Sequence, residues 1–180
     1  LRLRAAEVLE PIYVQLEDVR AQVTLSELLA TYLPDVQERI SRLRQVAILR
    51  NTLNEPTAAL DALSRAARLG VGEAVLPDLL DLIEAQVRAN KAQKEQVALY
   101  RELGDSILDV GVQERVFLSI AGEAYGLGDR DTSREYYRRV LDGAAEHLGA
   151  LEALEKIYSE GREFEPLLEI YTRRAELAQK

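Results

Sequence analysis

Residues 124–141 read AYGLGDRDTSREYYRRVL, and this stretch decides the fold. A small residue and an aromatic come first, a Gly-Asp turn follows, and Ser133, Tyr137 and Val140 then recur at spacings of four and three residues. Such spacing places side chains on one face of an α-helix. The stretch therefore predicts two helices joined by a tight turn, with Tyr137 facing the core. The arginines on the second helix are expected to face solvent, namely Arg134, Arg138 and Arg139.

The same helical pattern recurs along the whole chain. VQERI at 36–40 returns as VQERV at 112–116, an offset of 76 residues, and LEPIY at 9–13 returns as LEKIY at 154–158, an offset of 145. Two units of about 38 residues and four of about 36 account for these offsets, and such a period is typical of helical solenoids. We expect an all-α, right-handed solenoid of five antiparallel helix pairs, forming a single domain over residues 1–180.

Short polar breaks divide the apolar stripes into ten helices. Asn54-Glu55-Pro56 separates two of them, with Asn54 as a cap and Pro56 tolerated in the first turn. Pro11 is expected to kink the first helix or to mark its start, and Gly104 is expected to break the sixth. The expected helices cover residues 3–16, 19–32, 36–53, 56–69, 73–89, 92–109, 112–127, 130–142, 145–160 and 163–178.

The composition excludes several classes of function. Apolar residues make up 47% and charged residues 30% of the 180 residues, which is ordinary for a folded helical protein. The net charge of −8 argues against nucleic acid, because that affinity depends on clustered Lys and Arg. The chain has no Cys, which excludes disulfides and thiolate zinc sites. No apolar run approaches the roughly 18 residues of a membrane span, so no membrane insertion is expected.

Both ends of the chain have a helical pattern. The sequence begins at Leu1 without a Met or a signal peptide and ends in RRAELAQK at 173–180. We therefore expect a fragment of a longer repeat array, and cut ends of this kind would allow copies to associate with one another. Targeting segments would be invisible in such a fragment, so the compartment stays unknown, and the cytoplasm is favoured because no signal is visible.

The opening stretch resembles a tetratricopeptide repeat (TPR). The family pattern has a small residue and an aromatic late in the first helix, here Ala124 and Tyr125, followed by a Gly-Asp turn. Its second helix carries small, large aromatic and small residues, here Ser133, Tyr137 and Val140. The resemblance covers essentially the whole chain and implies the fold, because these motif residues are packing residues.

Other repeats depart from the family pattern. Arg50 stands where an aromatic is usual, and Arg174 stands where a small apolar residue is expected. The resemblance implies that the first helices of successive pairs line a concave groove that receives a peptide or a partner helix. By register with the family, the partner-binding positions are Arg44, Ile48, Asn51, Ser119, Glu123, Glu152 and Lys156. Because Ser119, Glu123 and Ile48 occupy places where one subgroup grips a terminal carboxylate with Lys and Asn, no such clamp is expected.

The residues offer little for catalysis. His147 is the only histidine, and it has neither Cys nor a second His to share a metal, so we interpret it as a solvated helix residue. The pairs Glu152/Glu155 and Glu163/Glu165 could form a general acid and base, but solvated faces of amphipathic helices account for both pairs. We expect no metal and no cofactor.

Two further motifs have ordinary explanations. GEAYGLG at 122–128 is rich in glycine but follows no strand, so it lacks the setting of a phosphate-binding loop. REYYRR at 134–139 mixes bases with aromatics, but helical spacing splits the two kinds between opposite faces. The sequence thus predicts a non-enzymatic scaffold or adaptor that binds another protein or peptide. The alternative is a regulatory or substrate-recruiting arm of an enzyme whose catalytic domain lies outside this chain.

Overall fold

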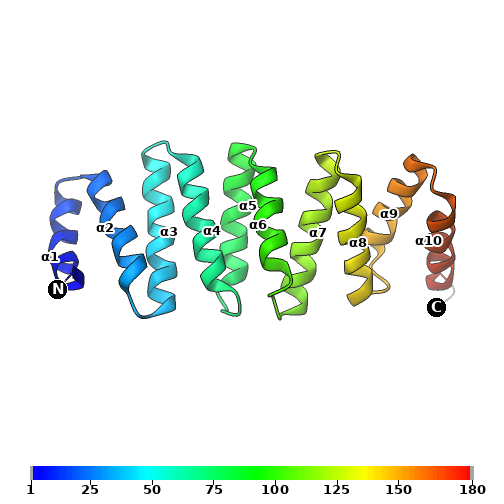
Figure 1. Cartoon of the computed structure of the whole chain (residues 1–180), viewed down its shortest axis with the longest axis horizontal. Coiled ribbons are helices and arrows are strands. Elements are labelled where there is room, and N and C mark those ends of the chain that lie inside the picture. The colour runs from blue at the N-terminus through cyan, green and yellow to red at the C-terminus, as the bar shows by residue number, and fades with distance from the viewer. Residues whose placement is uncertain (1, 179–180) are drawn as a thin grey trace. The chain divides into compact units, whose positions relative to one another are not determined.

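The chain is helical throughout its described length. The computed structural model describes residues 2–178, with all of their side chains except those of residues 2 and 7; the helical ends expected at residues 1 and 179–180 lie outside this range. Every element within residues 2–178 is an α-helix (Figure 1), which confirms the all-α fold. The helices are α1 (Arg2–Gln15), α2 (Val19–Tyr32), α3 (Val36–Thr52), α4 (Pro56–Gly70), α5 (Leu76–Asn90), α6 (Gln93–Gly104), α7 (Val110–Gly126), α8 (Arg130–Gly143), α9 (Leu148–Gly161) and α10 (Phe164–Leu177).

The chain divides into two compact units. Unit 1 covers Leu1–Gln93 and holds α1 to α5, and unit 2 covers Lys94–Lys180 and holds nearly all of α6 together with α7 to α10. Consecutive helices pack against each other from α1 to α5 and again from α7 to α10. The single domain expected over residues 1–180 stays a prediction.

A residue with left-handed backbone follows each odd-numbered helix and defines the repeat. These residues are Glu17, Asn54, Lys91, Gly128 and Arg162, with φ between 52° and 83°. The first four are spaced 37 residues apart, and the last comes 34 residues later. Each one lies in the turn to the following even-numbered helix. Five equivalent turns confirm the five expected helix pairs.

The spacing of the left-handed residues shows that only one of the two sequence matches marks equivalent positions. Glu17 and Arg162 are 145 residues apart, which equals the offset between LEPIY and LEKIY, so those two segments occupy equivalent positions. Asn54 and Gly128 are 74 residues apart, two fewer than the offset between VQERI and VQERV. The second match is therefore displaced by two residues and does not mark equivalent positions.

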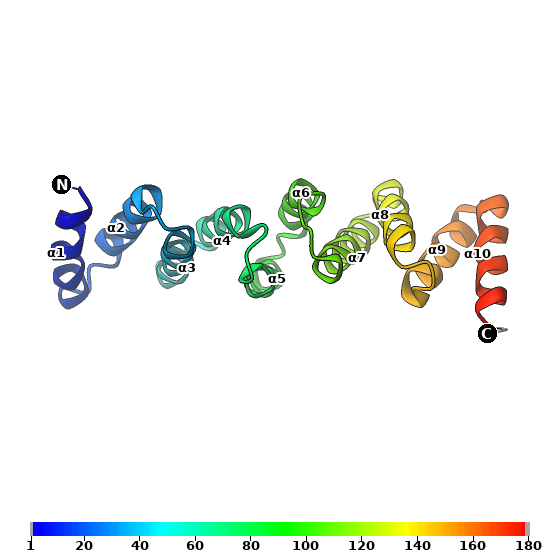
Figure 2. The ribbon, with the colours of Figure 1, turned by 90° about the horizontal axis from the view of Figure 1, so that it is seen from below.

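The core of unit 1 lies between two rows of helices. Figure 2 shows α3 and α5 on one side of this unit and α2 and α4 on the other. Ile40 and Leu43 of α3 pack with Leu79 of α5, and the small residues Ala30 and Ala66 fill the places where α2 and α4 approach them. All five are at most 3% exposed. Burial of such apolar surface is the main stabilising contribution to a stack of short helices.

Asn54 ends α3, whereas the sequence suggested that it caps α4. Its φ is 60°, and its N–H donates to the Asn51 carbonyl at 2.9 Å while the Glu55 N–H donates to the Arg50 carbonyl at 2.9 Å. These bonds satisfy carbonyls that the end of a helix leaves open, and Asn tolerates the left-handed conformation better than most residues. Glu55 precedes α4 without a side-chain capping bond, and Pro56 opens that helix as expected.

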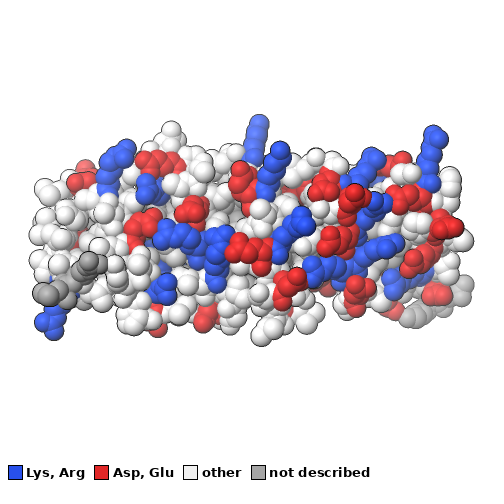
Figure 3. All heavy atoms as spheres, in the orientation of Figure 1, with Lys and Arg blue, Asp and Glu red and all other residues white. Residues whose placement is uncertain are grey.

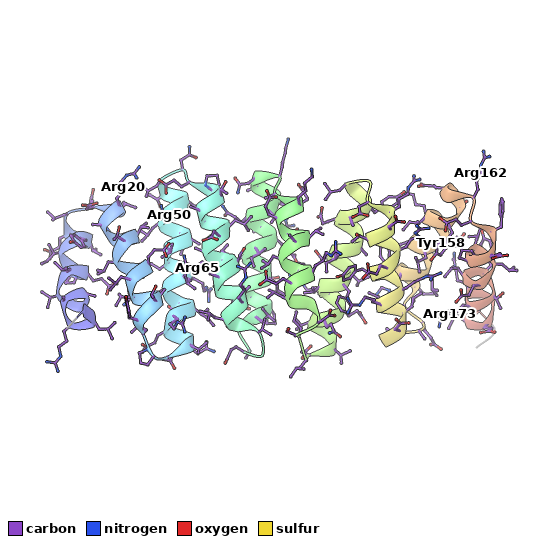
Figure 4. All side chains as sticks on the ribbon, in the orientation of Figure 1. Arg20, Arg50, Arg65, Tyr158, Arg162 and Arg173 are labelled. Carbon is purple, nitrogen blue, oxygen red and sulfur yellow. The ribbon has the colours of Figure 1, made fainter. Side chains whose placement is uncertain are left out.

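An ion-pair network takes the place of the aromatic that the family pattern expects at Arg50. Arg50 donates to Glu55 at 2.6 Å and lies 3.9 Å from Glu27. Glu27 also accepts from Arg65 at 2.7 Å, and Arg20 lies 3.6 Å from Glu55. Figure 4 labels the three arginines, which come from α2, α3 and α4. Charge therefore links three helices where a ring would otherwise pack.

In unit 2 the buried tyrosine of α8 is Tyr136, which corrects the expectation for Tyr137. Tyr136 is 4% exposed, and its ring meets that of Phe117 edge to face, with centroids 5.5 Å apart and planes at 64°. Val140 lies one helical turn after Tyr136, so both share a face. Arg139 was expected in solvent, but its guanidinium lies over the rings of Phe117 and Tyr136 at 4.3 and 5.1 Å.

Helix α6 ends at Gly104, as the sequence predicted. A Cβ on this residue would lie 2.9 Å from the Phe117 ring, so α6 and α7 meet here at a distance that only glycine allows without a shift. The Gln113 side-chain amide donates to the carbonyls of Gly104 and Ile107, at 2.9 and 3.1 Å. These bonds cover backbone groups that the end of the helix leaves open.

Some helix boundaries differ from the expected ones. Helix α5 begins at Leu76 and not at residue 73, because Gly72 has a φ of 85° and the chain makes an extra turn before the helix. Helix α9 begins at Leu148 and not at residue 145, because His147 caps it. Helix α1 runs through Pro11, so this proline does not mark its start.

Candidate functional site

Three of the expected site residues lie on one face of α3 in unit 1. Arg44, Ile48 and Asn51 come ten, six and three residues before the left-handed Asn54. Such spacing aligns them along the helix. Ile48 is 67% exposed, Asn51 is exposed, and Arg44 is half-buried and forms no ion pair with residues 2–178. This face offers an apolar side chain, a cation and an amide.

An amide pair extends the face of α3 to α5. The Asn51 Nδ2 donates to the Gln86 Oε1 at 3.0 Å, and the Gln86 Nε2 donates back to the Asn51 Oδ1 at 2.9 Å. The Gln86 Nε2 also contacts the Pro56 carbonyl at 3.1 Å. Gln86 was not among the expected residues. The repeat gives a signal that could have found it, because the two amides are 35 residues apart, close to one period.

In unit 2 the positions of α7 that are equivalent to those of α3 differ by one residue from the positions expected from the family pattern. Counted back from Gly128, the positions equivalent to the three on α3 are Leu118, Gly122 and Tyr125. Ser119 and Glu123 come one residue later than the first two of these. The Ser119 hydroxyl accepts a hydrogen bond from the buried Gln96 of α6 at 3.1 Å. Ser119 therefore contacts α6, and Glu123 is half-buried.

Lys156 belongs to a cluster that joins α7, α8 and α9. Its Nζ lies 4.9 Å from the centroid of the Tyr125 ring. The Tyr125 hydroxyl donates to the Glu160 carboxylate at 2.9 Å, and the Arg130 Nη2 donates to the same carboxylate at 3.0 Å. Lys156, Glu160 and Arg130 are exposed, and Tyr125 is half-buried. We call these four residues the Tyr125 cluster.

Tyr137 lies next to this cluster. A Cβ on Gly122 would be 3.9 Å from the Tyr137 hydroxyl, so the tyrosine reaches from α8 to the position on α7 that lacks a side chain. Burial of the Tyr137 side chain raises its pKa, and the nearby Tyr125 makes a second, smaller contribution in the same direction. The hydroxyl thus stays protonated at neutral pH and can act as donor or acceptor.

Two acidic residues of α9 and the glutamate that precedes α10 lie close to arginines. Arg174 of α10 pairs with Glu155 and lies 3.9 Å from the exposed Glu152. Glu163 pairs with Arg134 at 2.6 Å. Arg174, at a position where the family pattern has a small apolar residue, is thus held by two carboxylates.

His147 has a structural position. It precedes α9, and its Nδ1 accepts a hydrogen bond from the Ala150 N–H at 3.0 Å, while its Nε2 lies 3.8 Å from the Glu114 carboxylate. The solvated helix residue expected from the sequence is therefore a half-buried N-cap. Within the described residues, no group of three or more His, Cys, Asp or Glu side chains is arranged to hold a metal ion. No helix of residues 2–178 has the length and apolar character needed to cross a lipid bilayer.

The helix pairs, their left-handed turns and the exposed face of the odd-numbered helices define a TPR-like helical repeat fold. No family model and no curated protein matches the chain. Among solved structures, the TPR-like repeats of a candidate kinesin light chain from Podosopora anserina align over 99% of this chain and 96% of that chain, with a TM-score of 0.51 and 16% identity. A variant of that protein aligns over 99% and 97% of the two chains, with a TM-score of 0.49 and 16% identity. At this identity the first likeness concerns the fold alone.

Proposed function

We propose that the chain is a non-enzymatic scaffold that binds another protein or a peptide through the exposed side chains of its odd-numbered helices. The Tyr125 cluster is the observation that carries this proposal. It places the aromatic ring of Tyr125 on α7 beside a cation and a carboxylate of α9 and a cation at the start of α8. Tyrosine and arginine are enriched at protein interfaces, because they combine a large contact area with directed hydrogen bonds.

The face of α3 and α5 supports the same function. Ile48 is 67% exposed and adds a large apolar side chain to this face. Asn51 and Gln86 bind each other through one donor and one acceptor each. Both N–H groups of Gln86 are used, on Asn51 and on the Pro56 carbonyl, but Asn51 keeps a second N–H and each amide oxygen keeps a lone pair for the backbone of an extended segment. Arg44 adds a cation on the same side of α3.

The charges favour a protein partner of mixed charge and not a polyanion. In the Tyr125 cluster Arg130 is neutralised by Glu160, which leaves Lys156 as its one unpaired cation. Phosphate binders instead collect many cations and lose affinity steeply as salt rises. We expect binding here to depend moderately on salt, because exposed charges are screened beyond about 8 Å at physiological ionic strength.

Charge reversal on the two faces tests the proposal. The full chain is immobilised as wild type and as the double variant Arg44→Glu, Lys156→Glu, and bound proteins from a cell extract are compared by quantitative mass spectrometry. We expect at least one protein to be retained by the wild type and lost by the double variant. That protein, once purified, should bind in the presence of EDTA, because no metal takes part.

The matched control reverses two other cations, both of them exposed. Lys91→Glu with Arg162→Glu changes the net charge equally and affects one residue in each unit, but both lie in left-handed turns outside the odd-numbered helices. This control should retain the same proteins as the wild type. The proposal fails if the control loses them equally, or if the double variant retains every protein that the wild type retains.

A further inference from the structure

A groove runs between the even-numbered helices α8 and α10 of unit 2. Helix α9 packs against both of them and forms its floor. The groove has two parts, of about 440 Å³ and about 340 Å³, and Arg138 lines both. Figure 4 labels Tyr158 and Arg173 in this region. None of the residues assigned to the odd-numbered face lines either part, so the groove is a separate surface.

Arg138 and Tyr158 are hydrogen-bonded to each other at the centre of the groove. The Arg138 Nε donates to the Tyr158 hydroxyl at 2.8 Å, and its guanidinium carbon lies 5.6 Å from the centroid of that ring. Tyr158 is only 2% exposed, so packing in the core fixes the position of its hydroxyl. Because the hydroxyl oxygen accepts this bond, its proton remains available to another acceptor.

The terminal nitrogens of Arg138 are open. Arg134, one turn earlier on α8, is neutralised by Glu163 and Asp131. Arg138 is exposed and pairs with no carboxylate of residues 2–178, although acidic side chains also line the groove. A guanidinium with two free parallel N–H groups matches a carboxylate geometrically. The Tyr158 hydroxyl can donate to a second acceptor of the same ligand.

The second part of the groove is apolar at its base. Leu141 of α8, Leu154 of α9 and Ile170 of α10 line it, with exposures of 4%, 0% and 4%. Arg173 of α10 lines the same part and forms no ion pair with the described residues. The groove thus presents an apolar strip between two unpaired guanidinium groups.

We propose that this groove binds an acidic, partly apolar peptide segment of a partner protein. One carboxylate of the segment binds the two Arg138 Nη groups, and the Tyr158 hydroxyl donates to a second acceptor of the segment. An adjacent apolar side chain lies on Leu154 and Ile170, and a second carboxylate meets Arg173. This surface goes beyond the proposed function, which concerns the odd-numbered helices.

The acidic rim selects against a nucleic acid. The groove is also lined by Glu135, Asp142, Glu163 and Glu169, and Figure 3 shows acidic and basic side chains intermixed over α8 to α10. A strand of closely spaced phosphates would meet these carboxylates, and repulsion would offset the two arginines. A peptide with separated carboxylates avoids that repulsion and gains from the apolar strip.

Peptide selection tests this proposal. A phage-displayed library of random peptides is selected on the full chain and counter-selected on the variant Arg138→Gln, and the surviving peptides are measured by fluorescence polarisation. We expect them to combine Asp or Glu with apolar residues. We expect Arg138→Gln and Arg138→Lys to weaken binding about tenfold or more, which is typical of a lost bond to a charged group. Tyr158→Phe and Arg173→Gln should each weaken it by a smaller factor.

The matched control is Arg162→Gln, which removes one exposed positive charge from the same unit outside the groove. It should bind within about twofold of the wild type, because screened surface charges contribute little. Changing the peptide carboxylates to amides should abolish the difference between the wild type and Arg138→Gln. The variant Arg44→Glu, Lys156→Glu should bind these peptides normally, so the two proposals fail separately.

Three results would overturn the proposal. The selection could yield no peptide that distinguishes the wild type from both Arg138→Gln and Arg138→Lys. The selected peptides could lack acidic residues. Labelled oligothymidylate could bind in place of the peptides with the same dependence on Arg138, which would identify a nucleic-acid groove. Circular dichroism of each variant confirms that the comparison concerns folded protein.

Discussion

Adjacent tyrosines in α8 have different surroundings because consecutive side chains on a helix point about 100° apart. Tyr136 points into unit 2, where it contacts Phe117 and is covered by Arg139. Tyr137 points toward Gly122 and Tyr125 and is only half-buried. The first tyrosine therefore stabilises the fold, and the second contributes a hydroxyl to the region of the candidate site.

Truncation of each tyrosine should separate these roles. Tyr136→Ala is expected to lower the free energy of unfolding by about 3–5 kcal/mol, as the loss of a large buried aromatic does. Tyr137→Ala should lower it by about 1–2 kcal/mol, because less surface is removed from contact. Urea denaturation followed by circular dichroism measures both. Equal losses for the two variants would contradict this assignment.

The spacing of apolar residues predicted most of the buried side chains but not which face of α8 turns toward the core. Tyr136 and Tyr137 lie three and four residues after Ser133, and both spacings belong to the same helical face. The Phe117 ring on α7 decides between them, and a contact between helices is not visible in a local pattern. Arg50 likewise appeared as a departure from the family, because its partner Glu27 is on another helix.

Aspartate begins several of the helices and closes their first turns. Asp18, Asp35, Asp109 and Asp129 precede α2, α3, α7 and α8, and each side chain accepts the N–H of the residue three positions later. That bond satisfies one of the donors that the start of a helix leaves open. The carboxylate also interacts favourably with the positive end of the helix dipole. Asp18 and Asp129 thus cap the second helix of a pair, and Asp35 and Asp109 cap the first.

Removal of one cap should have an effect that depends on pH. The Thr132 hydroxyl and backbone N–H, both donating to the Asp129 carboxylate, lower the pKa of Asp129 from 3.8. A lowered folded pKa means that the stabilisation is complete above the unfolded value and is lost as pH falls through the folded value. Asp129→Ala should therefore cost about 1 kcal/mol of unfolding free energy at neutral pH.

The same measurement in acid provides the check. In urea denaturation, the difference between the wild type and Asp129→Ala should shrink once the pH falls below 3.8. Asp129→Asn keeps an oxygen that can accept the Thr132 N–H but cannot titrate, so its own stability should lack this acid-dependent step. A difference between wild type and Asp129→Ala that persists unchanged in acid would show that the carboxylate charge is not involved.

The helices themselves were predictable, and some of their ends were not. Gly128 and Asn54 carry the residue types expected in a left-handed turn, and the sequence marked both breaks. Glu17, Lys91 and Arg162 occupy the equivalent turns with side chains that give no such signal. Their conformation is imposed by packing of the helix pair, at about 1–2 kcal/mol each. The period of 37 residues is therefore clear in the backbone and faint in the sequence.

At the scale of the molecule, the candidate site was predicted as a face and not as a set of contacts. The alignment with the family pattern correctly placed Lys156 and Asn51 on odd-numbered helices. Their partners Tyr125 and Gln86 come from the neighbouring repeat, and nothing within one repeat specifies them. The groove at Arg138 escaped notice because REYYRR was interpreted as one helix surface, whereas α9 and α10 complete the groove.

The first and last helices both expose apolar stripes. Val8 and Ile12 on α1 and Leu16 directly after it are 65%, 43% and 68% exposed. On α10 the exposed apolar residues are Phe164, Leu168 and Tyr171, at 72%, 66% and 47%. Elsewhere in each unit such stripes are covered by the next helix. A second copy of the chain can cover them, with the α10 stripe of one copy on the α1 stripe of the next. Contacts of this heterologous kind add further copies, in an open chain or, where the rotation closes, in a ring.

We expect the wild type to sediment faster as its concentration rises, because head-to-tail contacts add further copies. Leu168→Glu and Ile12→Glu should each remain monomeric, since each places a charge in one stripe. An equimolar mixture of the two should form dimers and nothing larger, because each variant keeps one intact stripe. Leu108→Glu is the control, since Leu108 is 88% exposed outside both stripes. Dimers of Ile12→Glu alone would instead indicate that two α10 stripes pair with each other, and a monomeric wild type at every concentration would remove self-association altogether.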